Sequence, residues 1–187
     1  MKYYKKIVGE RVYLSPIDPD DFETYTKWLN DISITKNMGA HRLMISALSE
    51  KEKLIEMSKA GNNYAIIKKE NDVLIGNCSL MNIDYINKTA EFGIFIGEEE
   101  NRNIGLGTES AKLLLEFGFR ILNLNNIMLR VFSFNAGAIK AYIKAGLKEF
   151  GRRTGSQILN GKYYDEIYME ALANEFESDY LLSVLPE

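Results

Sequence analysis

The chain has 187 residues, a formal net charge of −3, and hydrophobic residues at 46% of its positions. This composition indicates a globular protein, and the sequence predicts a single domain over residues 1–187. The negative balance, without a block of basic residues, argues against nucleic-acid binding. No run approaches twenty apolar residues and the N-terminus lacks an apolar signal region, so we expect a cytoplasmic protein without a membrane partner.

One cysteine and one histidine restrict the chemistry further. Cys78 lies in an apolar, strand-like run, where a buried and unreactive thiol is expected, and a lone cysteine cannot form an internal disulfide. A histidine-based catalytic triad would have to use His41, and no neighbouring motif supports one. The sequence contains no cluster of metal ligands, so we expect no metal site.

The N-terminal third predicts one strand followed by helices. Residues 11–17 alternate as in a β-strand, and the apolar residues of 22–29 recur at helical spacing. Residues 30–45 are less regular and predict a loop or a broken helix. Ser49 and Glu52 then form a capping box for a further helix.

Gly61 ends that helix, and the apolar period changes from helical to two. Residues 64–69, 73–83 and 89–96 predict a three-stranded antiparallel meander. An amphipathic helix over 111–122 follows after a glycine-containing loop.

The loop from Arg102 to Thr108 is the most informative stretch of the chain. It contains Gly105 and Gly107 and lies between a strand and a helix, where free backbone N–H groups and the helix dipole attract anions. It is neither a Walker loop nor a dinucleotide fingerprint, because the lysine of the first and the third glycine of the second are absent. The loop therefore predicts a pyrophosphate site, while glycines that serve only the turn are the alternative.

The C-terminal part completes the set of elements. They are a strand over 126–132, a helix over 135–145, a hairpin of strands 147–159 and 162–171, and an amphipathic or frayed tail over 174–187. Asn135 is the expected N-cap, Gly146 the expected C-terminal stop, and Asn160-Gly161 the hairpin turn. This order predicts an α+β fold (α/β three-layer) with a mixed, mainly antiparallel central sheet and helices on both faces.

Two motifs together resemble the GNAT N-acetyltransferases. Asn135, Ala138-Ile139, Tyr142, Lys144 and Gly146-Leu147 are similar to the late helix of that family, with Leu147 in place of the usual Phe. Arg102-x-x-Gly105-x-Gly107 is similar to its acetyl-CoA loop. Within the family the sequence looks most like the ribosomal-protein N-terminal acetyltransferases and the spermidine/spermine N-acetyltransferases. The resemblance implies a GNAT-like fold with a splayed strand pair.

The resemblance also implies that acetyl-CoA binds as a co-substrate to three groups of residues. These are the pyrophosphate loop (Arg102, Asn103, Ile104, Gly105, Leu106, Gly107, Thr108), the strand edge that pairs with pantetheine (Ile94, Phe95, Ile96), and the late helix with its cap (Asn135, Ala138, Tyr142, Lys144). A backbone N–H near Ile94 would stabilise the oxyanion of acyl transfer. The alternatives are core packing for the isoleucines and a solvated side chain for Lys144.

Two residues are candidates for proton transfer. By resemblance, Tyr142 is the general acid that protonates the departing thiolate, and the alternative is a tyrosine that only packs by its ring. Because a lysine-like amine has a pKa of about 10.4, some base or water chain must take a proton from the acceptor. Glu91, just before the cofactor strand, is the candidate, and the alternative is a surface carboxylate paired with a cation.

The acceptor is the least determined part of the function. The resemblance implies an N-acetyltransferase whose acceptor is a small amine, polyamine-like or an amino sugar, or alternatively a protein N-terminus. A non-catalytic acyl-CoA-binding module is a third reading, against which Tyr142 argues. Residues 30–61 would form a wall or lid for the acceptor, and Glu98-Glu99-Glu100 is a solvated turn or an attractant for a polycation. Homodimers or higher homo-oligomers are frequent in the family.

Overall fold

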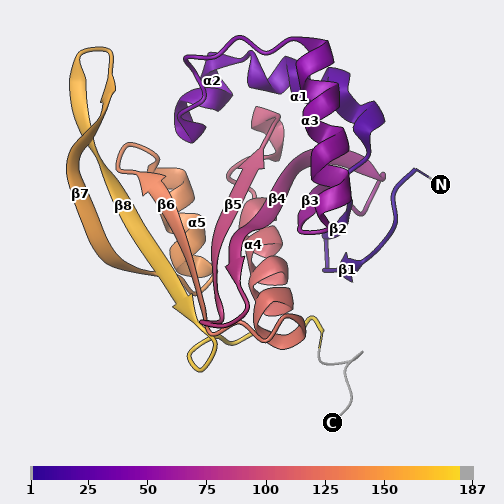
Figure 1. Ribbon diagram of the computed structural model, residues 1–187, viewed down its shortest axis with the longest axis vertical. Helices are drawn as coiled ribbons and strands as arrows, with labels where there is room; N and C mark the ends of the chain where they lie inside the picture. The colour runs from indigo at the N-terminus through magenta and orange to yellow at the C-terminus, as the bar shows by residue number, and fades with distance from the viewer. Residues whose placement is uncertain (1, 182–187) are drawn as a thin grey trace.

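The computed structural model describes residues 2–181 and contains one eight-stranded sheet between two layers of helices (Figure 1). The strands run in the order β1-β2-β3-β4-β5-β6-β8-β7. Their bounds are Ile7–Val8 (β1), Val12–Pro16 (β2), Asn63–Lys68 (β3), Val73–Asp84 (β4), Thr89–Ile96 (β5), Asn126–Phe132 (β6), Lys148–Leu159 (β7) and Lys162–Leu172 (β8). The mixed, mainly antiparallel sheet with helices on both faces confirms the predicted fold class.

The α-helices follow the predicted order. They are α1 (Phe22–Leu29), α2 (Ile32–Thr35), α3 (Ala47–Ala60), α4 (Leu106–Glu116) and α5 (Ala136–Lys144). Short 3-10 segments lie at Pro19–Asp21 (η1), Lys36–Met38 (η2) and Glu99–Asn101 (η3), and a π-helical turn, η4, extends α4 over Phe117–Ile121. No helix within residues 2–181 is both long enough and apolar enough to cross a membrane.

Alternation along the central strands divides the core into two clusters. Leu14 and Ile66 join the larger cluster, to which α4 contributes, whereas their neighbours Tyr13 and Ile67 join a second cluster with α1 and α3. Successive side chains of a strand point to opposite faces, so the sheet must be covered on both sides. Figure 1 shows α1 and α3 on one side of β3 to β5 and α4 on the other.

One strand pair is only partly formed. β5 and β6 are parallel, and their register runs from Thr89↔Asn126 to Glu91↔Met128, where the pairing stops. Beyond Glu91, β5 continues in register with β4, and β6 continues in register with β8. The two strands therefore splay, as the resemblance implied, and this leaves one edge of β5 open.

Local signals placed most boundaries well, with a few errors. The prediction of a capping box at Ser49 is wrong. The Ser46 side chain caps α3 instead and accepts the Ser49 N–H at 3.1 Å. The expected helix over 111–122 begins earlier, at Leu106, and its last part is π-helical. Strand β1 was not predicted, since two residues are too short for a period-two pattern. Gly61 ends α3 in the left-handed region, as expected.

The segment after β8 is anchored up to Leu181. The buried Glu116 carboxylate accepts hydrogen bonds from the Ser178 hydroxyl at 2.6 Å and from the Tyr180 and Leu181 N–H groups at 3.1 and 3.0 Å. An isolated buried carboxylate is costly, and these donors compensate it. The predicted tail over 174–187 is thus fixed to α4 through Leu181, and residues 182–187 lie outside the described part of the chain.

Candidate active site

Beyond Glu91, the edge of β5 that faces β6 has no strand partner within residues 2–181, although the Ile96 carbonyl on it accepts from Arg102 Nε. The Gly97 N–H donates to the Ile75 carbonyl at 2.8 Å, and the Phe95 carbonyl lies so close to Gly76 that a Cβ there would come within 2.1 Å of it. Residues 95 and 97 thus face β4. Because main-chain groups alternate along a strand, those of Ile94 and Ile96 face the splay instead. This edge suits an extended ligand with amide groups.

The glycine loop lies beside this edge. Gly105 has a φ of 91° and immediately precedes α4, so Leu106, Gly107 and Thr108 present N–H groups without helical acceptors. A Cβ at Gly107 would touch only Ile96 Cγ1, at 3.7 Å, which leaves its N–H approachable. Free N–H groups at the positive end of an eleven-residue helix fit a pyrophosphate.

Arg102 does not point freely into the anion site. Its Nε donates to the Ile96 carbonyl at 3.1 Å, and its Nη2 donates to the Gly97 carbonyl. The side chain therefore ties the loop to the end of β5. The guanidinium adds positive charge near the loop, but its hydrogen bonds go to the two β5 carbonyls. The sequence motif did not indicate these bonds.

Arg11 is a residue that the sequence reasoning missed. Its Nη2 donates to the Ile104 carbonyl at 2.8 Å, and its Nε lies 3.5 Å from Glu109 Oε2. The buried Glu109 also accepts the Arg11 N–H at 2.8 Å, which fixes the start of β2 to α4. Arg11 thus brings a second cation to the glycine loop. No linear pattern links residues 93 positions apart.

The late helix meets the loop at its N-terminus. Asn135 caps α5 by accepting the Ala138 N–H at 3.3 Å, as predicted. A Cβ on Gly137 would lie 3.3 Å from Asn103 Oδ1, so the two sequence motifs come together. Ala138 is partly buried against the larger core cluster. The exposed Lys144 lies about 10 Å farther along α5, which places its Cα away from the loop.

Tyr142 lies under the splay. Its ring meets the Phe92 ring edge-on at 6.1 Å, one residue after the last β5–β6 pair. The residue is half-buried, and burial raises the pKa of its phenol to about 12. The hydroxyl is therefore protonated at neutral pH, as a general acid must be.

Glu91 lies on the opposite face of the sheet from Phe92 and Tyr142. Its Oε1 accepts from Arg130 Nε at 2.8 Å and forms an ion pair with Arg130 Nη2, also at 2.8 Å. Its Oε2 accepts from Asn82 Nδ2 at 3.1 Å. The carboxylate is thus paired with a cation, the arrangement weighed as the alternative to a base. The ion pair lies where the splay between β5 and β6 begins. This position is the same whether Glu91 acts as a base or only as the partner of a cation.

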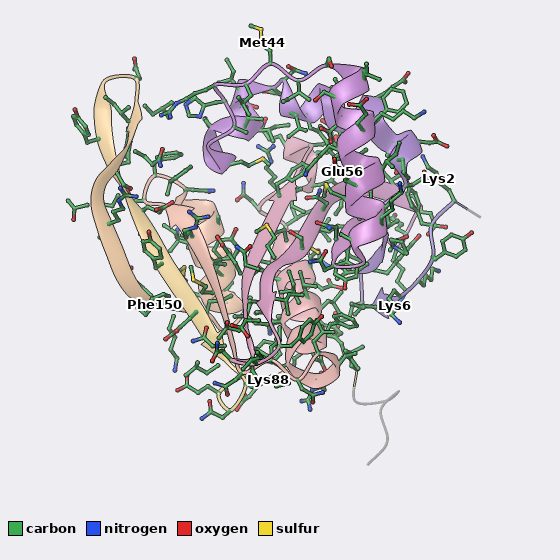
Figure 2. All side chains as sticks on the ribbon, viewed as in Figure 1. Lys2, Lys6, Met44, Glu56, Lys88 and Phe150 are labelled. Carbon is green, nitrogen blue, oxygen red and sulfur yellow. The ribbon has the colours of Figure 1, made fainter. Side chains whose placement is uncertain are left out.

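A cavity of about 440 Å³ opens near the C-terminal ends of β5 and β6. It is lined by Ser33, Lys36 and Asn37 of the α2–η2 segment, Glu99 and Arg102 next to the loop, Phe134, and Leu159 and Tyr164 of the β7–β8 hairpin. Three residues of the segment 30–61 thus line this cavity, while the predicted role of that segment as a wall for the acceptor stays a prediction. Figure 2 marks this end of the molecule by Met44, and the far end by Lys88 in the β4–β5 turn.

A second cavity, of about 540 Å³, lies on the α1 side, and its lining within residues 2–181 includes none of the predicted site residues. Of the three adjacent acidic residues 98–100, Glu98 accepts from Lys27 Nζ at 2.8 Å and from Trp28 Nε1 at 3.0 Å. The hydrogen bond from Lys27, followed by that from Trp28, lowers the pKa of Glu98. Glu98 is thus a local anchor for α1.

Comparison with known proteins agrees with this geometry. Residues 11–148 match the acetyltransferase (GNAT) domain. The chain is 27% identical to the uncharacterized N-acetyltransferase p20 of Bacillus licheniformis, over 89% of this chain and 96% of that protein. It is 28% identical to the spermidine N(1)-acetyltransferase of Vibrio cholerae, over 78% of this chain and 90% of that protein.

The fold matches solved structures as well. The crystal structure of spermidine N-acetyltransferase from Vibrio cholerae, in complex with CoA and spermine, superposes with a TM-score of 0.79. It covers 92% of this chain and 99% of the other, at 24% identity. Because the family match covers well over half of the sequence, this chain belongs to the GNAT family of N-acetyltransferases, which use acetyl-CoA.

Proposed function

We propose that this chain transfers the acetyl group of acetyl-CoA directly to a primary amine within one ternary complex, and that the whole chain acts as a single domain. The observation that carries the proposal is the splay. An open strand edge at Ile94 and Ile96 lies between Tyr142 on one face of the sheet and Glu91 on the other. Among the described residues that form this site none is a suitable nucleophile, which favours direct transfer over a covalent enzyme intermediate.

The chain's own groups divide the work. Acetyl-CoA supplies an activated thioester when it is bound. The N–H groups of Leu106, Gly107 and Thr108 would hold its pyrophosphate, and the free edge of β5 would pair with its amide-containing arm. The Ile94 N–H would donate to the developing oxyanion, a contact that can be worth a few kcal/mol.

Proton transfers would run on the two faces of the sheet. Tyr142 would donate its proton to the leaving sulfur, and its raised pKa means that the phenol carries that proton at neutral pH. Glu91, or water that it orients, would accept the proton of the amine. The Glu91 carboxylate is already engaged by its ion pair with Arg130, so a water relay is the competing route.

Two classes of acceptor fit the site. Relatives named as spermidine N(1)-acetyltransferases support a small amine, polyamine-like or an amino sugar. The charges around the 440 Å³ cavity favour the second class, the N-terminus of a protein. Its charged lining residues are Lys36, Arg102 and Glu99, so it does not have the acidic lining that a polycation would need.

The deciding experiment is thiol release from acetyl-CoA across a panel of spermidine, glucosamine and peptides with a free N-terminus. We expect release with at least one acceptor, and a product that carries one acetyl group on nitrogen. Glu91→Gln should flatten the acidic limb of the pH–rate profile if Glu91 is the base, and an unchanged profile would remove it. Tight CoA binding without release for any acceptor would contradict the enzymatic proposal.

A further inference from the structure

The sheet face opposite Tyr142 carries one cation between two carboxylates at the splay. Arg130 of β6 pairs with Glu91 of β5 at 2.8 Å, and its Nη1 lies 3.8 Å from Glu166 Oε1 of β8. Glu166 is only 8% exposed, and its Oε2 accepts from the Tyr168 hydroxyl at 3.1 Å. The register places Tyr168 opposite Arg130, so all four side chains share one face of the sheet.

This cluster lies along β6 between the start of the splay and the strand end that faces the cavity. Glu91 belongs to the last β5–β6 pair, and Phe132 follows Arg130 by two positions on the same face. A Cβ on Gly39 would lie 3.3 Å from the Phe132 ring, so the segment after α2 closes over that end of the face. Arg130 thus lies on β6 between the last β5–β6 pair and the end of the strand beside the cavity.

The charge of the cluster matters for any acceptor. Two carboxylates attract a cation strongly only while they are free, and here Arg130 occupies the position between them. The bond to Glu91 also raises the pKa of Arg130 above its ordinary value, so the guanidinium keeps its charge. The other polar neighbours are Asn82 from β4, Glu170 from β8, which already accepts from Asn126 at 2.7 Å, and Arg153 from β7, which lies opposite Glu166 in the strand register.

We infer that Arg130 is a positioning and specificity-determining residue for acetyl transfer, and that it restricts the acceptor to molecules whose reacting amine is their only cationic group. Arg130 holds the Glu91 carboxylate at the splay and occupies the position that a second ammonium of a polyamine would take. The class of acceptor that fits is therefore an amino sugar or the N-terminus of a peptide without a nearby basic residue. This inference rests on the proposed function.

The test compares Arg130→Gln, Arg130→Lys and the wild type, with Arg152→Gln as control, because Arg152 is an exposed, ion-paired arginine of β7 that lies opposite Ile167, on the other face of the sheet. Steady-state kinetics are measured with spermidine, with glucosamine and with a peptide that has a free N-terminus and no charged side chains. In Arg130→Gln, kcat/KM for spermidine relative to glucosamine should rise about threefold, since a partly exposed ion pair has an effect of this order. Arg130→Lys and Arg152→Gln should stay within about twofold of the wild type.

The pH–rate profile separates positioning from general stability. Arg130→Gln removes the cation that holds the Glu91 side chain, so its pH–rate profile for kcat/KM should differ in shape from that of the wild type. Glu166→Gln leaves the pair of Glu91 and Arg130 in place, so its profile should match that of the wild type. Thermal midpoints show whether each variant is folded. If Arg130→Gln does not fold, the comparison of Glu166→Gln and Arg130→Lys with the wild type still tests the inference.

The outcomes are distinct. If the wild type releases no thiol with any acceptor, the proposed function fails, and the role of Arg130 fails with it. If the wild type is active but spermidine is already its best acceptor, only the inference about Arg130 is overturned. The same holds if the acceptor ratio and the pH–rate profile are alike in Arg130→Gln and Arg152→Gln.

Discussion

The ring of Tyr142 packs edge-on against the ring of Phe92, with a centroid separation of 6.1 Å and perpendicular planes. This contact fixes the phenol from a short helix against the strand residue at which the β5–β6 ladder ends. The general-acid role requires such a fixed position, since proton transfer depends on geometry first and on pKa second. Removal of the Tyr142 hydroxyl therefore tests the general-acid role.

Tyr142→Phe should lower kcat by about 10²- to 10⁴-fold, the range for loss of a positioned general acid, while CoA affinity changes little. The ring contact with Phe92 is retained in this variant, so the fold should be unaffected. Tyr163→Phe is the matched control, because Tyr163 is 73% exposed on the β7–β8 hairpin. Full activity of Tyr142→Phe under conditions where chemistry limits turnover would remove Tyr142 as the acid.

The same substitution has a signature in stability at alkaline pH. Burial raises the pKa of Tyr142 from 10.0 to about 12, so its proton stays bound longer in the folded state than in the unfolded state. Its contribution to the free energy of unfolding is complete below pH 10 and is lost as pH rises toward 12. Urea denaturation between pH 8 and about 11 should therefore show a shallower loss of stability in Tyr142→Phe than in the wild type.

The two glycines of the loop should respond differently to alanine. Gly105 has a φ of 91°, and a Cβ there would lie 2.8 Å from Arg11 Nη2, so Gly105→Ala should destabilise the fold by about 1–2 kcal/mol. Gly107→Ala has room in the free protein and should fold normally. Its methyl group would instead obstruct the anion, so CoA affinity should fall while the thermal midpoint stays the same. Equal CoA affinity in Gly107→Ala and the wild type would contradict the pyrophosphate assignment.

Local chemistry made part of this fold predictable. Asn135 as an N-cap, Gly61 as a helix stop and the Asn160-Gly161 hairpin are signals contained within a few residues, and the structure confirms them. The boundary of α3 was wrong because Ser46 and Ser49 both offer a capping hydroxyl. Residue type alone does not decide which of two nearby serines takes the extended conformation.

The candidate site was less predictable, because its contacts join distant strands. The motif indicated the loop and Tyr142, but the cation that faces Glu91 lies 39 positions away, on β6. A carboxylate and an arginine at that separation carry no periodic signal, and only the parallel β5–β6 register places them on one face. The contacts of Arg102 could not be predicted for a related reason, since its carbonyl partners depend on how the loop folds back on β5.

Arg11 offers a test of the long-range contact at the loop. Arg11→Gln removes a cation next to the helix N-terminus, so KM for acetyl-CoA should rise, and the difference from the wild type should shrink as salt screens the charge. Lys5→Gln is a suitable control, because it removes an exposed charge near the N-terminus away from the loop. A KM ratio that does not change between about 0.05 and 0.5 M salt would show that Arg11 acts only through packing of the loop.

The cavity lined by Lys36 should contribute to the choice of acceptor. Lys36 is exposed on η2, so Lys36→Glu is expected to fold normally while the charge of the cavity lining changes sign. The introduced carboxylate and that of Glu99 would then outweigh Arg102 and favour polycations, so kcat/KM for spermidine relative to a neutral-side-chain peptide should rise about threefold. Lys59→Glu, with the same change of charge in the last turn of α3, should leave the ratio unaltered. The contrary result is a raised KM for acetyl-CoA in Lys36→Glu with an unchanged acceptor ratio. That result would assign the cavity to the phosphate end of the cofactor. The argument for an acceptor without extra positive charge would then rest on Arg130 alone.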